Sequence, residues 1–292
     1  MPELKPLLTG LVFGESPRWH DQRLWCVDMG AHEVIAADLE GNSEVIVRVP
    51  TGLSAIDWLP DGRMLIAPWS GRHLLRQEPD GSLVTHADLT SLSEYPWNDM
   101  VVDGRGNAYI GNLGWNFPNG EFHPGILALV SPDGTARQVA DDLYFPNGVV
   151  VTPDNSTLII AELRGRRLTA FDINPDGSLS NRRVWADLAG TIPDGICLDA
   201  ENTIWYASLA LQPGQGPVRV REGGQVVQAI DGIEGGVCIA CMLGGTNGRT
   251  LFLMVNRPGP PDVTQWGTSD APRAGRVLTI EAPAPAAGWP RN

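Results

Sequence analysis

The sequence has few charged residues and no long hydrophobic segment. Only 19% of the 292 residues are charged. No window approaches the roughly 18 to 20 consecutive apolar residues that a membrane-spanning helix requires. The first ten residues also lack a basic patch followed by an apolar run, so they do not look like a secretory signal peptide. These absences predict a cytoplasmic protein.

Basic residues are scarce relative to acidic ones. Lysine and arginine together number 21 against 34 aspartates and glutamates, which gives a formal net charge of −13. A surface of this sign repels phosphate backbones and anionic lipids. We therefore expect neither nucleic acid nor a membrane as a partner, but a small-molecule substrate. The sequence leaves the oligomeric state open.

Cysteine is rare as well. Four cysteines are too few for a disulfide scaffold in a chain of this length, and in the cytoplasm they should be reduced. Cys238 and Cys241 have the C-x-x-C spacing that elsewhere indicates redox chemistry or zinc. They lie in the apolar run 236–243, which is typical of a buried strand, where positions three apart point to opposite faces. We interpret them as buried structural cysteines.

Glycine and proline, in contrast, are abundant, and one pattern recurs along the chain. The 34 glycines and 24 prolines, with 42% hydrophobic residues, are typical of a strand-rich and turn-rich protein. Each copy of the pattern has a short apolar strand, a tight Asp/Gly/Asn turn, a second apolar strand and a third strand. The six copies begin at Ser16, Ala55, Asp99, Gly148, Gly195 and Cys238.

The period of this repeat predicts the fold. Equivalent turns at Asp61, Arg105, Asp154 and Glu201 are 44, 49 and 47 residues apart. That length accommodates four short antiparallel strands, which make one blade of a β-propeller. We predict an all-β, six-bladed β-propeller with four-stranded antiparallel blades, formed by residues 1–292 as a single domain. Residues 3–13 should pair with the last blade and close the ring, and residues 283–292 should form a tail.

Polar residues recur where the innermost strand of each blade should begin. Counting back seven residues from the turn selects Glu15, Ala55, Asn98, Asn147, Asp194 and approximately Val237. Four of these six are carboxylates or amides, the oxygen ligands that calcium or magnesium needs, and two carboxylates with neutral amides leave positions open for water and substrate. Each residue alone is also compatible with a turn or a solvated loop. Their recurrence in four blades favours a metal site.

Four short segments carry a resemblance to a known family. Those segments are Gly14-Glu-Ser-Pro-Arg-Trp19, Asn98-Asp99, Phe145-Pro-Asn-Gly148 and Pro193-Asp-Gly195. They resemble, in the same order, the signature segments of the gluconolactonase family, which includes senescence marker protein (regucalcin). The similarity spans residues 10–282.

The resemblance implies a six-bladed propeller with one catalytic divalent metal ion. The ion would bind through Glu15, Asn147 and Asp194, with Asn98 close to both metal and substrate. Calcium is the expected ion, with zinc, manganese or iron(II) as alternatives. The implied activity is hydrolysis of a lactone, in which the metal polarises the carbonyl and Asp194 assists the attack of water. The alternatives are a phosphotriesterase-like hydrolase, a lactone-forming or cyclising enzyme, and a non-catalytic metal-binding propeller.

One departure from the family pattern concerns the substrate. Relatives that hydrolyse sugar lactones often carry Arg-x-Asn-Asp, whereas this chain has Pro96-Trp97-Asn98-Asp99. We expect the aromatic side chains of Trp97, Trp69, Trp115 and Phe117 to bind the substrate. Lactones with apolar or aromatic substituents should then be preferred over sugar lactones, unless Arg164 or Arg257 replaces the missing arginine.

Overall fold

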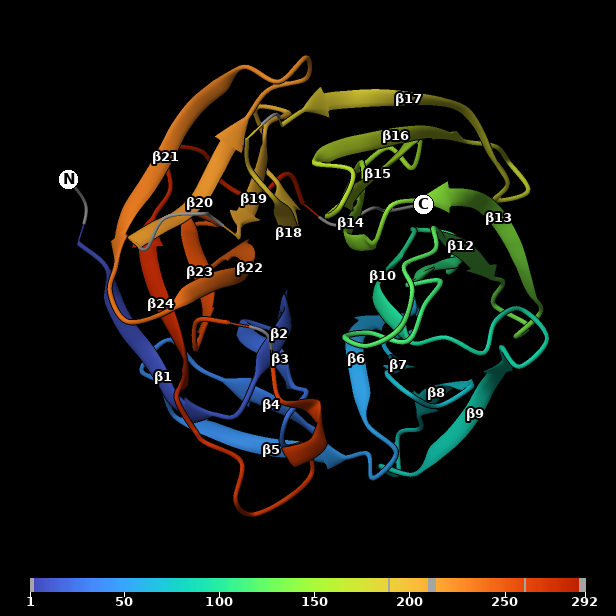
Figure 1. The fold of residues 1–292 in the computed structure, drawn as a ribbon, viewed down its shortest axis with the longest axis horizontal. Helices are drawn as coiled ribbons and strands as arrows, with labels where there is room; N and C mark the ends of the chain where they lie inside the picture. Colours follow the sequence, from blue (N-terminus) through green and yellow to red (C-terminus); the bar gives the residue numbers. More distant parts are fainter. Residues whose placement is uncertain (1–2, 189, 210–213, 260, 289–292) are drawn as a thin grey trace.

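The computed structural model describes residues 3–188, 190–209, 214–259 and 261–288. Within these residues, 24 strands form six four-stranded antiparallel sheets, and the only helix is a single 3-10 turn, η1 (Val263–Gln265). The sheets surround a central axis, which Figure 1 views end on. No helix in this part of the chain is long and apolar enough to cross a membrane. The predicted six-bladed β-propeller is confirmed.

The first three blades follow one another along the chain, each running from its innermost to its outermost strand. Blade 1 contains β2 (Gly14–His20), β3 (Arg23–Asp28), β4 (Glu33–Ala37) and β5 (Ser43–Arg48). Blade 2 contains β6 (Leu53–Trp58), β7 (Met64–Pro68), β8 (His73–Gln77) and β9 (Leu83–Asp88). Blade 3 contains β10 (Trp97–Val102), β11 (Ala108–Asn112), β12 (Gly125–Val130) and β13 (Ala136–Leu143).

The last three blades repeat this order, except that the outermost strand of blade 6 comes from the N-terminus. Blade 4 contains β14 (Pro146–Val151), β15 (Thr157–Glu162), β16 (Arg167–Ile173) and β17 (Leu179–Asp187). Blade 5 contains β18 (Pro193–Leu198), β19 (Ile204–Ser208), β20 (Gly214–Val220) and β21 (Val226–Ile233). Blade 6 contains β22 (Val237–Gly244), β23 (Thr250–Asn256), β24 (Gly275–Glu281) and β1 (Lys5–Leu11).

The N-terminal strand closes the ring. β1 pairs antiparallel with β24, with Lys5 opposite Thr279 and Leu11 opposite Gly275. Figure 1 shows the two strands side by side at the outside of blade 6. The predicted closure by residues 3–13 is therefore confirmed. In the predicted tail, the amide of Ala286 donates to the carbonyl of Gly248, and residues 289–292 lie outside the described part of the chain.

The recurring Asp-Gly turns follow from local chemistry. In the β6–β7 turn, Asp61 Oδ1 accepts a hydrogen bond from the amide of Arg63 at 3.0 Å, and Gly62 has a φ of 85°. Asp176 accepts from the amide of Ser178 in the same way at 3.0 Å. Aspartate stabilises the turn through its side chain, and glycine supplies the positive φ without steric strain.

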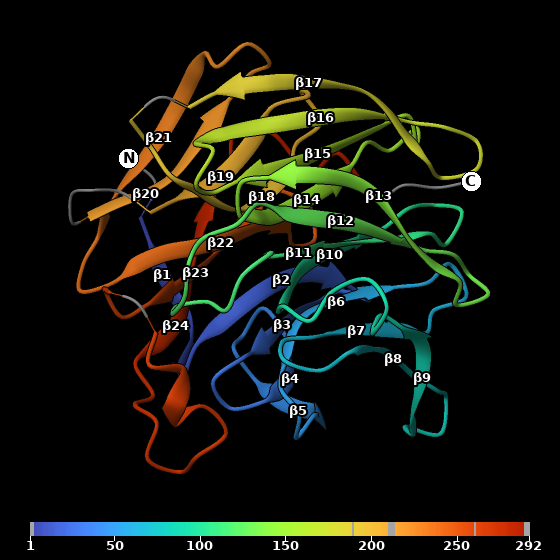
Figure 2. The ribbon, with the colours of Figure 1, turned by 45° about the vertical axis from the view of Figure 1, so that its right-hand side comes forward.

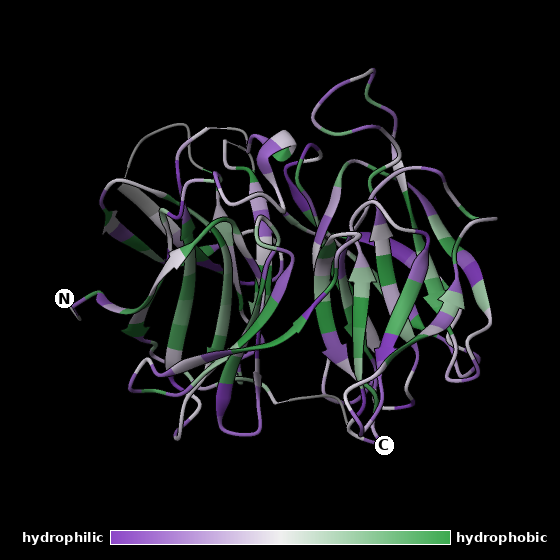
Figure 3. Cartoon of the chain, turned by 90° about the horizontal axis from the view of Figure 1, so that it is seen from below, coloured by the Kyte–Doolittle hydropathy of each residue, from purple (hydrophilic) through white to green (hydrophobic). Residues whose placement is uncertain are grey.

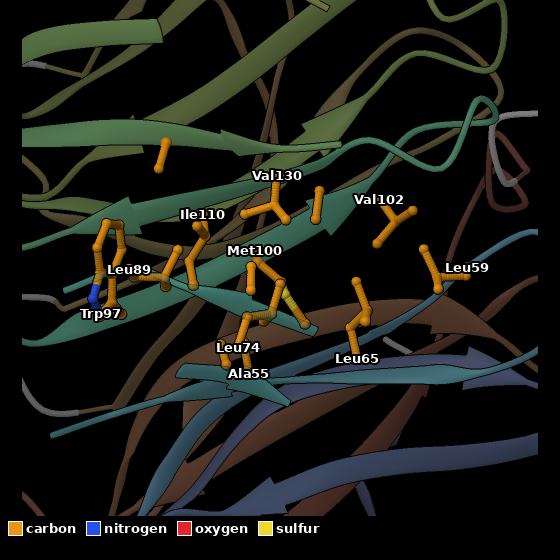
Figure 4. Packing of buried hydrophobic residues seen from close by; sticks show 14 residues of the cluster. Ala55, Leu59, Leu65, Leu74, Leu89, Trp97, Met100, Val102, Ile110 and Val130 are labelled. Atoms are coloured by element: carbon orange, nitrogen blue, oxygen red, sulfur yellow. The ribbon is translucent and has the colours of Figure 1, made fainter. Parts of the chain in front are cut away.

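The hydrophobic core lies between adjacent blades. All five residues of β7 are buried, because each blade packs another blade on both faces. Figure 2 shows neighbouring sheets stacked in this way, and in Figure 3 the hydrophobic residues concentrate along the strands. Figure 4 shows the cluster between blades 2 and 3, which includes Leu74, Trp97, Met100 and Ile110. This packing fixes the inner strands around the axis.

The two cysteines of the C-x-x-C sequence are buried, as predicted, but not on opposite faces. Cys238 and Cys241 belong to the same apolar cluster, and Cys241 Sγ lies 3.9 Å from Cys197 Sγ. A register shift between Cys238 and Ala240 interrupts the simple alternation of β22. The prediction of opposite faces was therefore wrong, because it assumed a regular strand.

Candidate functional site

The polar residues that recur in the sequence occupy equivalent places in four blades. Glu15, Asn98, Asn147 and Asp194 are each the second residue of an innermost strand. In every case the pairing register with the next strand shifts at this residue or directly after it. Such β-bulges re-aim a side chain. The four side chains line a single cavity of about 400 Å³, a volume within the usual range for small-molecule sites.

The other two blades present no ligand side chain here. The second residue of β6 is Ser54 rather than Ala55, which the sequence count had selected and which is buried in the core between blades 2 and 3. The hydroxyl of Ser54 donates to the backbone carbonyl of Asn98 at 2.9 Å, and so supports the neighbouring blade. In blade 6, Val237 lies at the predicted place and lines the cavity.

Hydrogen bonds orient all four polar side chains. The amide nitrogen of Asn98 donates to the carbonyl of Pro146 at 3.1 Å. The side-chain oxygen of Asn98 is then the atom left to act as a ligand or hydrogen-bond acceptor. Glu15 Oε2 accepts from the amide of Ser16 at 2.7 Å. Asn147 hydrogen-bonds the side chain of Asp194. The set is held in place by its own strands and by the adjoining ones.

One atom of the set has no partner. Asp194 is only 6% exposed, and its Oδ1 makes no hydrogen bond with any residue that the structure describes. Buried polar atoms in native proteins are nearly always satisfied, and an exception calls for a ligand, an ion or a catalytic role. The unpartnered oxygen is the clearest sign that these residues form a functional site.

The electrostatics of the cavity floor are unfavourable without a cation. Burial, and then the negative charge of Asp99, raise the pKa of Asp194 to about 8, although the hydrogen bond from Asn147 lowers it. Burial, followed by the charge of Asp194, raises the pKa of Glu15 well above its ordinary value. Burial and mutual repulsion oppose the ionisation of both carboxylates at once. A positive ion between them would offset this repulsion and make both carboxylates favourable ligands.

These donors fit a hard divalent cation. No three His, Cys, Asp or Glu side chains come together as a metal site within the described residues. A metal at the floor would therefore use two carboxylates, Glu15 and Asp194, together with the amide oxygens of Asn147 and Asn98. An all-oxygen set of this kind suits calcium or magnesium better than zinc.

A buried ion pair lies close in sequence to Glu15 and Asn98. Asp99 Oδ1 accepts from Arg18 Nη2 at 2.9 Å and from the amide of Met100 at 2.9 Å. Arg18 is only 5% exposed, and neither Arg18 nor Asp99 lines the cavity. Asp99 follows Asn98 directly in β10, so the ion pair anchors the strand that presents Asn98.

Aromatic rings form one wall of the cavity. Trp115 and Phe117, from the loop between β11 and β12, meet edge to face at a centroid distance of 5.6 Å. Phe117 packs edge to face against both Phe145 at 5.5 Å and Trp69 at 6.2 Å. Such edge-to-face contacts stabilise a rigid apolar surface. Trp69, Trp115 and Phe117 all line the cavity, and their contact with substrate stays a prediction.

The chain is similar to proteins of one family over most of its length. The family model described as the SMP-30/gluconolactonase/LRE-like region matches residues 13–257. The chain belongs to this family. The resemblance that the four sequence motifs indicated is thereby confirmed.

Three similar proteins share 30% or less of their residues with this chain in the matched regions. A 6-deoxy-6-sulfogluconolactonase from Pseudomonas putida is 25% identical over 273 residues, which cover 91% of each chain. A diisopropyl-fluorophosphatase from Loligo vulgaris is 30% identical over 205 residues, 61% of this chain and 63% of its own. The structure of a calcium-binding protein, regucalcin, from Agrobacterium tumefaciens superposes with a TM-score of 0.79 at 22% identity, covering 97% and 94% of the two chains.

Trp97 lies elsewhere than the sequence predicted. It is fully buried in the core between blades 2 and 3, and it does not line the cavity. Successive residues of a strand point to opposite faces, so a Trp97 side chain that packs between the blades leaves Asn98 directed at the axis. The prediction that Trp97 contacts the substrate was therefore wrong for this geometric reason.

This family member has further cavity residues that the sequence did not reveal. Phe13 and Trp266 extend the aromatic wall, with their ring centroids 5.4 Å apart. Trp266 follows η1 in the long connection between β23 and β24, for which the repeat pattern provides no counterpart. Arg164 and Arg257 also line the cavity, so the arginines considered as substitutes for the missing family arginine both reach the site.

Proposed function

We propose that this member of the gluconolactonase family is a lactonase-type hydrolase that opens a cyclic ester with the help of one divalent metal ion. Asp194 supports this proposal most directly, because its buried Oδ1 is unpartnered at the floor of an aromatic cavity. The P. putida relative, similar over nine-tenths of both chains, is named for the hydrolysis of a lactone.

Glu15, Asn147 and Asp194 would hold the ion, with the amide oxygen of Asn98 beside them. The donors are all oxygens, which favours calcium, with zinc, manganese or iron(II) as alternatives. When bound, such an ion supplies Lewis-acid polarisation of the lactone carbonyl. The two carboxylates would also neutralise the charge of the ion and be kept ionised by it.

The side chains of the cavity divide the remaining work. Asp194 acts as general base: it takes a proton from water while the water oxygen bonds to the acyl carbon. The ring bond between the acyl carbon and the alkoxide oxygen then breaks, and the proton passes to that oxygen, which yields a hydroxy acid. Asn98 orients the substrate. Trp69, Trp115 and Phe117 hold the apolar part of the lactone and limit the access of bulk water.

Organophosphate hydrolysis is the second candidate. The L. vulgaris relative is named for the hydrolysis of diisopropyl fluorophosphate, although it covers only 61% of this chain. A polarised phosphoryl oxygen and a base-assisted water are compatible with the same side chains. This candidate belongs in the same assay.

A substrate panel tests the proposed function. Calcium-loaded protein is offered gluconolactone, alkyl and aryl γ-lactones and diisopropyl fluorophosphate, and acid release is followed with a pH indicator. We expect turnover of at least one lactone, well above the rate with the Asp194→Asn variant. Faster turnover of the organophosphate than of every lactone would favour the second candidate. Tight calcium binding with no turnover of any substrate would contradict an enzymatic role and identify a non-catalytic metal-binding propeller.

A further inference from the structure

Arg164 is an exposed arginine on the rim of the cavity. It lies in the turn between β15 and β16, and its guanidinium carbon is 4.7 Å from the ring centroid of Trp115 and 4.5 Å from that of Phe122. The backbone amides of Arg164 and Gly165 both donate to the carbonyl of Tyr144, at 3.0 and 3.3 Å. The turn and the two aromatic rings together hold the guanidinium at the cavity.

The nearby acidic residue is already committed to other arginines. Glu162 is fully buried and pairs with Arg167 at 2.8 Å and with Arg182 at 3.4 Å. Arg164 makes no ion pair with a carboxylate within the described residues; its recorded side-chain partners are the two aromatic rings. A guanidinium that stacks through its face keeps its edge N–H groups available, and these donors match the two oxygens of a carboxylate.

The acidic and basic side chains of the cavity differ in exposure. Asp194 is buried and Glu15 is half-buried, whereas Arg164 and Arg257 are exposed, and aromatic side chains complete the same lining. The chain as a whole carries a net charge of −13, so two cationic side chains at one cavity are not a general property of its surface. A ligand that is polar at its carbonyl end, apolar in the middle and negative at its far end matches this arrangement.

We propose that Arg164 recognises an anionic substituent of the substrate, so that the substrate class is a lactone with an apolar or aromatic body and a carboxylate or similar anion remote from the ring carbonyl. This inference rests on the proposed lactonase function, because it places the ring carbonyl at Asp194. It also extends the expectation from the sequence, which favoured lactones with apolar or aromatic substituents over sugar lactones. The aromatic side chains bind the apolar part of the lactone, and Arg164 binds its anionic substituent.

Two matched probes test the role of Arg164. One is a γ-butyrolactone with a 4-carboxyphenyl substituent, and the other carries a neutral 4-carbamoylphenyl group of nearly the same shape. We expect wild-type kcat/KM to favour the carboxylate by about tenfold, since hydrogen bonds between charged groups are roughly twice as strong as neutral ones. The preference should shrink at high salt, because the rim is exposed.

Arg164→Gln removes the charge and keeps most of the side chain. This variant should turn over the two probes at rates within about twofold of each other, with the loss confined to KM for the carboxylate. The matched control is Arg166→Gln, because Arg166 is exposed in the same turn and does not line the cavity. Equal preference in wild type, or the same preference in both variants, would overturn the proposal.

A binding measurement separates this inference from the proposed function. Cyclopentanones with the same two substituents cannot be hydrolysed, and their affinities are measured by tryptophan fluorescence. If no lactone is opened but Arg164→Gln weakens the binding of the anionic ketone about tenfold, the anion site is supported and the hydrolase proposal fails. If neutral lactones are opened and the anionic ketone binds no better than the neutral one, the hydrolase proposal is supported and the anion site is wrong.

Discussion

Asp194 is the second residue of β18 and Asp199 directly follows that strand, yet their surroundings differ completely. Both are buried, at 6% and 0% exposure. Asp199 accepts hydrogen bonds from Thr203 and from the guanidinium of Arg219, the latter at 2.7 Å, and Arg219 also pairs with Glu201. Asp194 has one hydrogen bond from Asn147 and an unpartnered Oδ1, and no cationic side chain among the described residues pairs with it.

The glutamates repeat this contrast. Burial alone raises the pKa of Glu162. Hydrogen bonds from Arg167, Thr169 and the amide of Tyr144 outweigh burial, so the pKa is lowered overall. The pKa of Glu15 is raised, first by burial and then by the charge of Asp194. Glu162 accepts hydrogen bonds from the side chains of Arg167 and Thr169 and from the amide of Tyr144, whereas Glu15 accepts one from the amide of Ser16. Acids with several protein partners maintain the fold, and acids with few partners mark the place where a cation would bind.

Removal of divalent ions should have the largest effect. We expect chelated protein to lose lactone turnover by about 10³-fold or more, because metal polarisation contributes several kcal/mol to the transition state. Calcium should restore it. Circular dichroism before and after chelation serves as the control for folding. Full activity after metal removal has been verified by elemental analysis would contradict the proposed mechanism.

Replacement of the satisfied aspartate should affect stability instead. Asp199→Ala leaves Arg219 buried with only the partly exposed Glu201 as a partner, so the free energy of unfolding should fall by about 3 kcal/mol. Urea denaturation measures this loss. At 10 °C, where the variant is still folded, its kcat should remain within about twofold of wild type. A large loss of kcat in the folded variant would mean that Asp199, like Asp194, is needed for activity.

Asp194→Asn should show the opposite behaviour. It removes the proposed base and a ligand charge, and we expect kcat to fall by about 10²-fold or more, the usual scale for the loss of general-base catalysis. Asp154→Asn is the matched control. Asp154 is an exposed turn residue that accepts a hydrogen bond from the amide of Ser156, and an asparagine at this position can accept the same bond. Equal kcat values for the two variants would remove Asp194 from the mechanism.

The metal-free protein should be stabilised by the same Asp194→Asn change. Because the pKa of folded Asp194 is raised to about 8, the stability that its protonated form contributes is complete below about pH 4 and is lost as the pH rises through 8. Asparagine mimics the protonated form at every pH. With chelator present, the variant should exceed wild type by about 1–2 kcal/mol at pH 9 and by nothing at pH 4. Urea denaturation that finds the same difference at both pH values would contradict the raised pKa.

Much of this architecture follows from local sequence signals. The Asp-Gly turns recur at blade spacing, and each depends on contacts within a few residues, such as the hydrogen bond from Arg63 to Asp61. The positions of Glu15, Asn98, Asn147 and Asp194 relative to those turns are equally local. The repeat therefore predicted six blades, closure by the N-terminal strand, and which side chains meet at the axis.

Other features depend on contacts that no short segment encodes. The Trp97 side chain packs in the core between blades 2 and 3 while Asn98 lines the cavity, and this difference depends on how β10 pairs with β11 and packs against the neighbouring blade. Trp266 comes from an insertion outside the repeat. The pairing of Asp199 with Arg219 joins residues 20 positions apart on different strands. These features explain why a satisfied and an unsatisfied aspartate could not be distinguished in sequence.

Calcium titration calorimetry tests the central claim most directly. We expect wild type to bind one calcium ion per chain, more tightly as the pH rises to about 8, because Asp194 must lose its proton to become a ligand. Asp154→Asn should bind as wild type does, and Asp194→Asn should bind at least about 100-fold more weakly. Undiminished calcium binding by Asp194→Asn, or no binding by wild type, would contradict the assignment of this cavity floor as a metal site.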